Sequence, residues 1–94
     1  MSIDIHKLMN GRPTDLLLSI NDSEYAELLP AIEMYKAKTG LFIDQYGDLK
    51  LSSGVQPLIE SAKASTSGSK IYSSLISVLK QSEVGGYGII FVGD

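Results

Sequence analysis

Residues 87–92, YGIIFV, decide the fold class that the sequence predicts. The run is continuously apolar and does not alternate with polar residues, which is typical of a strand buried on both faces. We therefore expect it at the centre of a sheet. Gly85 and Gly86 come before it and follow a helical pattern, so they predict a helix end. A phosphate-binding loop would need the opposite order, with the strand first, then the glycines and then the helix.

The helix expected before these glycines follows a polar loop over residues 65–70. Its apolar stripe consists of Ile71, Tyr72, Leu75, Ile76, Val78 and Leu79. Apolar residues at this spacing predict one helix face that packs against the core.

Residues 41–54, LFIDQYGDLKLSSG, contain two acids around a tyrosine and a glycine. Residues 41–43 and 49–51 are predicted as two short strands, and Gly47 occupies a turn position between them. A hairpin is the simplest interpretation. A helix capped by Ser52 or Ser53 is expected next, with an apolar face made of Val55, Leu58, Ile59 and Ala62.

A longer helix is predicted over residues 21–40. Asn21 precedes the helical pattern and Glu24 follows three residues later, which is the spacing of a capping box. Gly40 is expected as a left-handed cap at the other end. Pro30 lies inside the pattern, where it either kinks one helix or begins a second. The apolar positions at helical spacing are Tyr25, Leu28, Leu29, Ile32 and Tyr35.

The N-terminal part is harder to assign. Residues 2–10 fit a short helix with Ile5, Leu8 and Met9 as its apolar side, whereas residues 14–20 are too short for periodicity to separate strand from helix. The whole pattern predicts one α+β domain over residues 1–94. We expect a sheet of about three strands, antiparallel or mixed, covered by three to four helices.

The composition limits the classes of function. The chain has no cysteine, which removes disulfides, thiolate catalysis and cysteine-ligated metals. The net charge is −3, and residues 1–48 hold eight of the eleven acids. No basic cluster is present, so we expect no nucleic-acid binding. The sequence shows neither a signal peptide nor a run long enough to cross a membrane, and a cytoplasmic location is the simplest expectation.

Residues that could carry catalysis or bind a metal are few. His6 is the only histidine, and a Ser-His-Asp arrangement would have to use it from a chain end that can fray. Asp44 and Asp48 do not have the ligand spacing of a calcium-binding EF-hand loop. We therefore predict no enzymatic activity, no cofactor and no metal. An enzyme stays open as an alternative that would depend on His6 and scattered carboxylates.

Asp44, Tyr46 and Asp48 are the best candidates for a protein contact. Asp and Gly are common in turns for structural reasons alone. However, an exposed tyrosine on a turn offers a large contact area at low entropic cost, and flanking acids suit a basic partner. Glu24 and Glu27, on the polar side of the long helix, are possible acidic flanks.

The segments KTGLFIDQYGDLKLSSG and SEVGGYGIIFVGD resemble the small immunity proteins of bacterial contact-dependent growth inhibition and related polymorphic toxin systems. The resemblance implies a non-enzymatic protein of the bacterial cytoplasm. Such a protein binds the toxin C-terminal domain encoded beside it, often a nuclease, and blocks the toxin's substrate-binding or active site.

A second hypothesis belongs to a different class. A short chain with an apolar sheet can cover an exposed edge strand by forming a homodimer, so a self-associating structural or regulatory module stays open.

Overall fold

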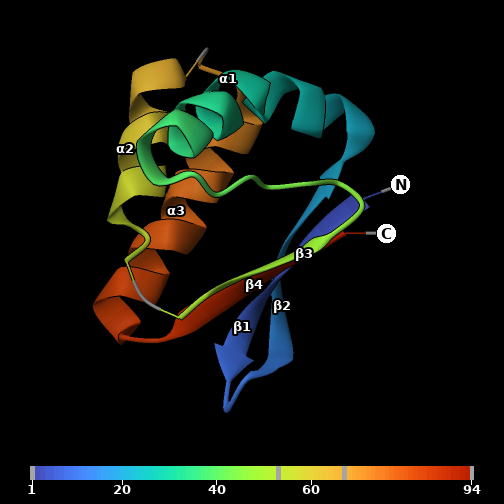
Figure 1. Ribbon diagram of the computed structural model, residues 1–94, viewed down its shortest axis with the longest axis vertical. Helices are drawn as coiled ribbons and strands as arrows, with labels where there is room; N and C mark the ends of the chain where they lie inside the picture. Colours follow the sequence, from blue (N-terminus) through green and yellow to red (C-terminus); the bar gives the residue numbers. More distant parts are fainter. Residues whose placement is uncertain (1, 53, 67, 94) are drawn as a thin grey trace.

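The computed structural model describes residues 2–52, 54–66 and 68–93. These residues form a four-stranded antiparallel sheet with three helices packed on one of its faces (Figure 1). The α+β prediction is confirmed, with four strands where about three were expected. In chain order the elements are β1 (Ser2–Met9), β2 (Arg12–Asn21), α1 (Asp22–Thr39), β3 (Asp48–Leu51), α2 (Gln56–Ser65), α3 (Lys70–Gly85) and β4 (Gly88–Gly93).

The strand order in the sheet is β2-β1-β4-β3. β4 therefore lies inside the sheet, as its continuous apolar sequence predicts, and joins the N-terminal hairpin to β3. Ile89, Ile90 and Phe91 are all buried, although their side chains alternate between the two faces. Ile89 and Phe91 belong to the core beneath the helices, whereas Ile90 does not.

The predicted helix over residues 2–10 is wrong, because this segment is strand β1. Ile3 and Ile5 are buried while their neighbours Ser2 and Asp4 are only partly so, which is the period of a strand. Long-range pairing decides the conformation, since Ile5 lies opposite Phe91 of β4. Residues 14–20, which the sequence left open between helix and strand, are part of β2.

β2 is an irregular edge strand. Its register against β1 shifts between Ile5 and His6 and again between His6 and Leu8, and at each shift β2 contributes one extra residue. Pro13 removes one backbone donor from the same strand. Bulges and proline make it harder for a strand of another chain to pair with the outer edge of β2.

The predicted hairpin over residues 41–51 is also wrong. The chain does reverse around Gly47, but residues 41–43 form no strand. β3 pairs instead with β4, so that Leu49 lies opposite Phe91 and Leu51 opposite Ile89. The turn was predictable from nearby residues, whereas the strand partner comes from the other end of the sequence.

α1 confirms the local predictions for its two ends. Asn21 and Glu24 form the capping box, and Gly40 adopts a left-handed conformation with its N–H donated to the Lys36 carbonyl. Pro30 lies within this single helix of 18 residues.

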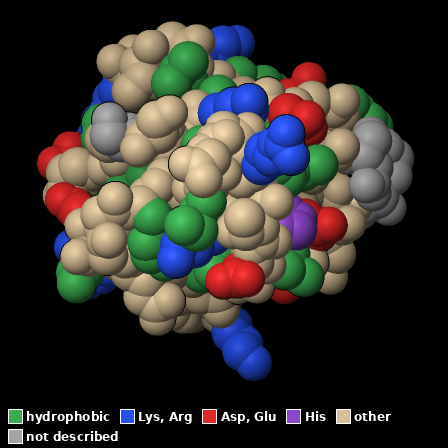
Figure 2. Space-filling view, turned by 90° about the horizontal axis from the view of Figure 1, so that it is seen from below, with side chains coloured by type: hydrophobic (Ala, Val, Ile, Leu, Met, Phe, Trp, Pro, Cys, Tyr) green, Lys and Arg blue, Asp and Glu red, His purple; other side chains and the backbone are tan. Residues whose placement is uncertain are grey.

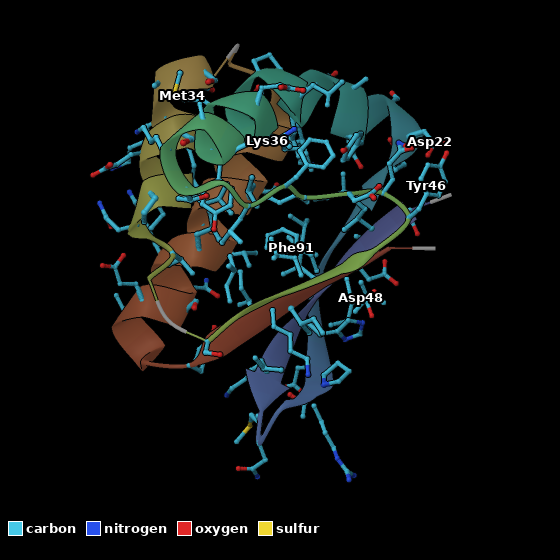
Figure 3. All side chains as sticks on the ribbon, viewed as in Figure 1. Asp22, Met34, Lys36, Tyr46, Asp48 and Phe91 are labelled. Carbon is cyan, nitrogen blue, oxygen red and sulfur yellow. The ribbon has the colours of Figure 1, made fainter. Side chains whose placement is uncertain are left out.

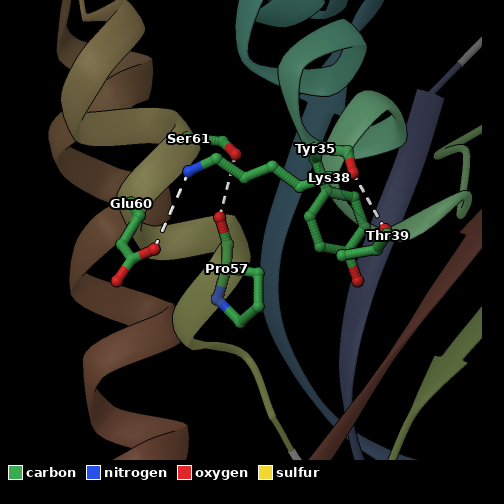
Figure 4. Close-up of polar contacts among 6 residues, drawn as sticks. All are labelled: Tyr35, Lys38, Thr39, Pro57, Glu60 and Ser61. Atoms are coloured by element: carbon green, nitrogen blue, oxygen red, sulfur yellow. Dashed lines mark hydrogen bonds and ion pairs between the residues drawn. The ribbon is translucent and has the colours of Figure 1, made fainter.

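α2 and α3 agree with the sequence except at the start of α2. Val55, not Ser52, occupies the N-cap position of α2, and Ser53 lies outside the described residues. α3 ends at Gly85, and Gly86 caps it in the left-handed conformation expected of a helix stop. Lys38 of α1 and Glu60 of α2 form an ion pair at 3.7 Å (Figure 4). Within the helices, the Thr39 hydroxyl donates to the Tyr35 carbonyl and the Ser61 hydroxyl to the Pro57 carbonyl.

Candidate functional site

The segment between α1 and β3 forms a tight turn that exposes a tyrosine. The carboxylate of Asp44 accepts the Tyr46 backbone N–H at 3.0 Å, and the Asp44 carbonyl accepts the N–H of Gly47 at 3.4 Å. These two hydrogen bonds reverse the chain over residues 44–47, and the bond to the Asp44 side chain is that of an Asx-turn. Tyr46 stands on this turn with 63% of its surface exposed.

The turn lies directly on the end of β4. Gly93 donates its N–H to the Gly47 carbonyl at 3.0 Å. A Cβ placed on Gly93 would lie 2.5 Å from the Gln45 carbonyl oxygen and 2.7 Å from that of Gly47, which is too close for any side chain. Glycine at position 93 is therefore what lets the turn approach the sheet.

On its other side the turn is joined to α1. The Tyr25 hydroxyl donates to the Ile43 carbonyl at 2.7 Å. The ammonium of Lys36, a residue labelled in Figure 3, lies over the ring of Phe42, 5.1 Å from its centroid. Burial raises the pKa of Tyr25, with smaller contributions from the negative charges of Asp44 and Glu33. The Tyr25 phenol therefore stays protonated as a donor, and the turn is held between helix and sheet.

The structure brings three of the predicted contact residues together. Asp44, Tyr46 and Asp48 belong to one turn and the strand it enters, and all three are exposed. Figure 3 shows Tyr46 and Asp48 at the same end of the molecule, with Phe91 on the opposite, helix-facing side of the sheet from Asp48. The grouping depends on the turn alone, since these residues are close in sequence.

Glu24 and Glu27 have other roles in the fold. The Glu24 carboxylate accepts the Asn21 backbone N–H at 3.0 Å as one half of the capping box, so one of its oxygens is already used in a hydrogen bond. Glu27 is exposed, but its carbonyl accepts the hydroxyl of Tyr72 at 2.6 Å, and after burial its charge is the second cause of the raised pKa of Tyr72. Among the described residues, no hydrogen bond or ion pair links Glu27 to the turn.

A surface that the sequence did not predict lies on the sheet face opposite the helices. We call it the open face, and it includes Asp4, His6 and Leu8 of β1, Leu16 and Ser19 of β2, Asp48 and Lys50 of β3, and Ile90 and Val92 of β4. Figure 2 shows the lone histidine among acidic and basic side chains on the side of the molecule seen from below. The error at residues 2–10 hid this face, because Asp4 and His6 alternate with Ile3 and Ile5 only in a strand.

The geometry around His6 is that of a hydrogen-bonded surface histidine. Its Nδ1 lies 3.1 Å from the carbonyl oxygen of Thr14, so the proton is on Nδ1 and is donated to β2. The nearby Asp4 carboxylate accepts from the Ser19 hydroxyl at 2.7 Å. Among the described residues no group of three or more His, Cys, Asp or Glu side chains could hold a metal ion.

One shallow recess of about 680 Å³ lies elsewhere, along the outer side of α3. Its lining residues are Ser73, Ile76, Ser77, Lys80, Gln81, Val84 and Gly85. It contains none of the residues that the sequence singled out.

Comparisons with protein-family models, with curated proteins and with solved structures each return no match. Within the part of the chain that the structure describes, every helix is too short or too polar to cross a membrane.

Proposed function

We propose that this chain is a non-enzymatic immunity protein that binds and occludes the toxin domain of a bacterial contact-dependent growth inhibition or related polymorphic toxin system. It would act in the cytoplasm against a basic toxin domain, most simply a nuclease. One observation carries the proposal. Tyr46 is exposed between Asp44 and Asp48 on a turn that both α1 and β4 hold in place.

A turn fixed in this way suits protein binding for a physical reason. Ordering a flexible loop on association costs free energy, and a turn that is already ordered avoids this cost. Tyrosine is among the residue types enriched at interface hot spots, because its ring gives a large contact and its hydroxyl a hydrogen bond.

The two carboxylates give the surface its selectivity. A nuclease must present a positive surface to the phosphates of its substrate. Asp44 and Asp48 on either side of Tyr46 offer negative charge to the same surface, so they compete with the nucleic acid and accelerate encounter. Glu27 would add to this field from a distance, whereas Glu24 also serves the α1 capping box.

The test is a capture experiment with paired variants. The tagged chain is used as bait in lysate of the native host, beside Tyr46→Ala/Asp48→Lys. We expect the unaltered chain to recover one toxin C-terminal domain and the double variant to lose it. The recovered domain is then purified and its nuclease activity measured with and without the chain.

Glu83→Lys is the matched control, since it makes the same charge change on the exposed surface of α3. Equal recovery by the double variant and the unaltered chain would move the contact surface away from the turn. A recovered domain whose activity the chain leaves unchanged would contradict the inhibitory role.

Self-association is a second candidate, which the β3 edge of the sheet favours. β3 is an edge strand that pairs with β4 in an unbroken register, whereas β2 at the other edge is irregular. Static light scattering across a concentration series separates the two proposals, since it needs no toxin.

A further inference from the structure

The open face carries its charges in two parallel rows. Cross-strand pairing places Asp4, Val92 and Asp48 in one row, with Ser19 hydrogen-bonded beside Asp4. The neighbouring row consists of Leu16, His6, Ile90 and Lys50. One row, the acidic row, carries the carboxylates of Asp4 and Asp48 on either side of Val92, and the next, the basic row, carries the Lys50 ammonium and the His6 imidazole on either side of Ile90.

Residues near the basic row extend the apolar part of this surface. Leu8 and Gly88 are cross-strand partners, and together with Lys50 they line a shallow hollow of about 220 Å³. Leu16 is 56% exposed. Within the described residues, neither Asp48 nor Lys50 has an ion-pair partner. The face therefore offers the unpaired charges of Asp48 and Lys50 at its β3 edge and the exposed Leu16 at its β2 edge, while Ile90 between them is buried.

We propose that two copies of this chain pack face to face through the open face. The two-fold axis lies between the two sheets. It runs across the strands, midway between the two rows, so that the acidic row of one copy lies over the basic row of the other. Each Asp48 then faces Lys50 of the second copy, and each Asp4 faces His6. An isologous interface must be complementary to itself, and adjacent rows of opposite charge satisfy this condition.

The alternative arrangements are less favourable. A two-fold axis parallel to the strands would place each row over the same row of the second copy, so that neither Asp4 nor Asp48 would face Lys50. Edge pairing through β2 would meet the two register shifts and Pro13, which leave its outer edge irregular. Of these arrangements, the axis across the strands is the one that brings Asp48 over Lys50, so the arrangement of charge favours it.

The size of the face sets the expected strength. Four strands about 4.8 Å apart and about six residues long cover roughly 400 Å² on each copy. Stable complexes bury about 800 Å² on each partner, so this dimer is weak and forms only at high protein concentration. Its charge pairs lie near solvent, and added salt will weaken it further.

Charge reversal with rescue is the decisive experiment. Sedimentation velocity is measured from micromolar to millimolar concentration for the unaltered chain, Asp48→Lys, Lys50→Asp and the double variant Asp48→Lys/Lys50→Asp. Each single reversal should lower the association constant about tenfold or more, because like charges then oppose each other at two symmetric positions. The double variant restores opposite charges and should recover dimerisation.

Two results would overturn the proposal. One is a monomeric mass for the unaltered chain at every concentration. The other is a dimer whose association constant is the same in both single variants, which would place the contact elsewhere. Lys80→Asp and Glu83→Lys on α3 are the controls and should leave the association constant unchanged, and circular dichroism checks that all variants are folded.

The inference does not rest on toxin binding, since the isolated chain is measured alone. Lys50→Asp also separates the two proposals. It should lower the association constant of the dimer about tenfold or more, yet leave the affinity for a basic toxin domain unchanged or higher, because it removes a positive charge beside Asp48.

Discussion

The two faces of the sheet are built from the same strands but differ in what they require of the sequence. On the helix side, Ile5, Ile89 and Phe91 belong to the core and are almost completely buried. On the open face, their immediate neighbours Asp4, Ile90 and the rest of the two charged rows have no helix above them. The helix side specifies the fold, whereas the open face can change its charges without changing the core.

Substituting adjacent isoleucines is the strongest test of this difference. Ile89 is 0% exposed on the helix side and Ile90 is 4% exposed on the open face. We expect Ile89→Ala to lower the free energy of unfolding by about 3–4 kcal/mol, because it leaves a cavity in the core. Ile90→Ala should cost less, about 2 kcal/mol, since water and flexible neighbours can fill part of the space that the side chain leaves. Urea denaturation measures both, and equal losses would contradict the distinction between the faces.

Alkaline pH should destabilise the core on the helix side of the sheet. Burial is the main cause that raises the pKa values of Tyr25, Tyr35 and Tyr72 above their ordinary value of 10.0. The unfolded chain therefore loses these phenolic protons first, so the stability is fully present below about pH 10 and falls as the pH rises through the raised pKa values. Thermal unfolding between pH 8 and about pH 11 measures the slope. Tyr72→Phe should make it shallower, and an unchanged slope would exclude Tyr72 as a cause.

Gly93→Ala tests the junction between the sheet and the exposed turn. The added Cβ would collide with the carbonyls of Gln45 and Gly47, so the turn must move. We expect a loss of about 1–3 kcal/mol in the free energy of unfolding, together with faster hydrogen exchange in residues 44–47. Gly54→Ala is not a suitable control, because Gly54 has a positive φ and an added side chain would strain its backbone. Unchanged exchange would mean that the turn does not depend on its contact with β4.

The smallest effect on stability is expected on the open face. Asp48→Lys changes an exposed residue that no described ion pair uses, so the free energy of unfolding should change by no more than about 0.5 kcal/mol. The same variant should lower both dimerisation and toxin binding. Equilibrium unfolding beside sedimentation gives the two numbers on one sample, and a large loss of stability would assign Asp48 to the fold instead.

The sequence was sufficient where the interactions are local. Asn21 and Glu24 are three residues apart, and Gly40 and Gly86 follow their helices directly, so these caps were predicted correctly, whereas the Ser52 cap predicted for α2 was not. The apolar run at Ile89, Ile90 and Phe91 predicted an interior strand, because burial on both faces leaves no alternation. The turn at residues 44–47 was predictable for the same local reason.

The sequence was insufficient where distant segments decide the structure. Ile5, Leu8 and Met9 fit helical spacing as well as Ile3 and Ile5 fit strand spacing, and nine residues cannot separate the two. Pairing with β4, more than 80 positions later in the chain, settles the conformation. The same partner draws β3 away from residues 41–43. Of the candidate site, the turn was foreseen, while the open face with Asp4 and Lys50 depended on these long-range pairs.

The position of β4 has a consequence for how the protein is made. β4 lies between β1 and β3 in space, yet it follows every other described element in the chain. While the ribosome extends the chain, β3 has no strand to pair with. In the hairpin of β1 and β2, the edge of β1 that pairs with β4 in the folded sheet is still unpaired. We expect the intermediate to bind chaperones until β4 emerges, since it exposes apolar strand surface. Ribosome-stalled chains that end before residue 88 should therefore be protease-sensitive, and extension by a linker beyond β4 should make them resistant.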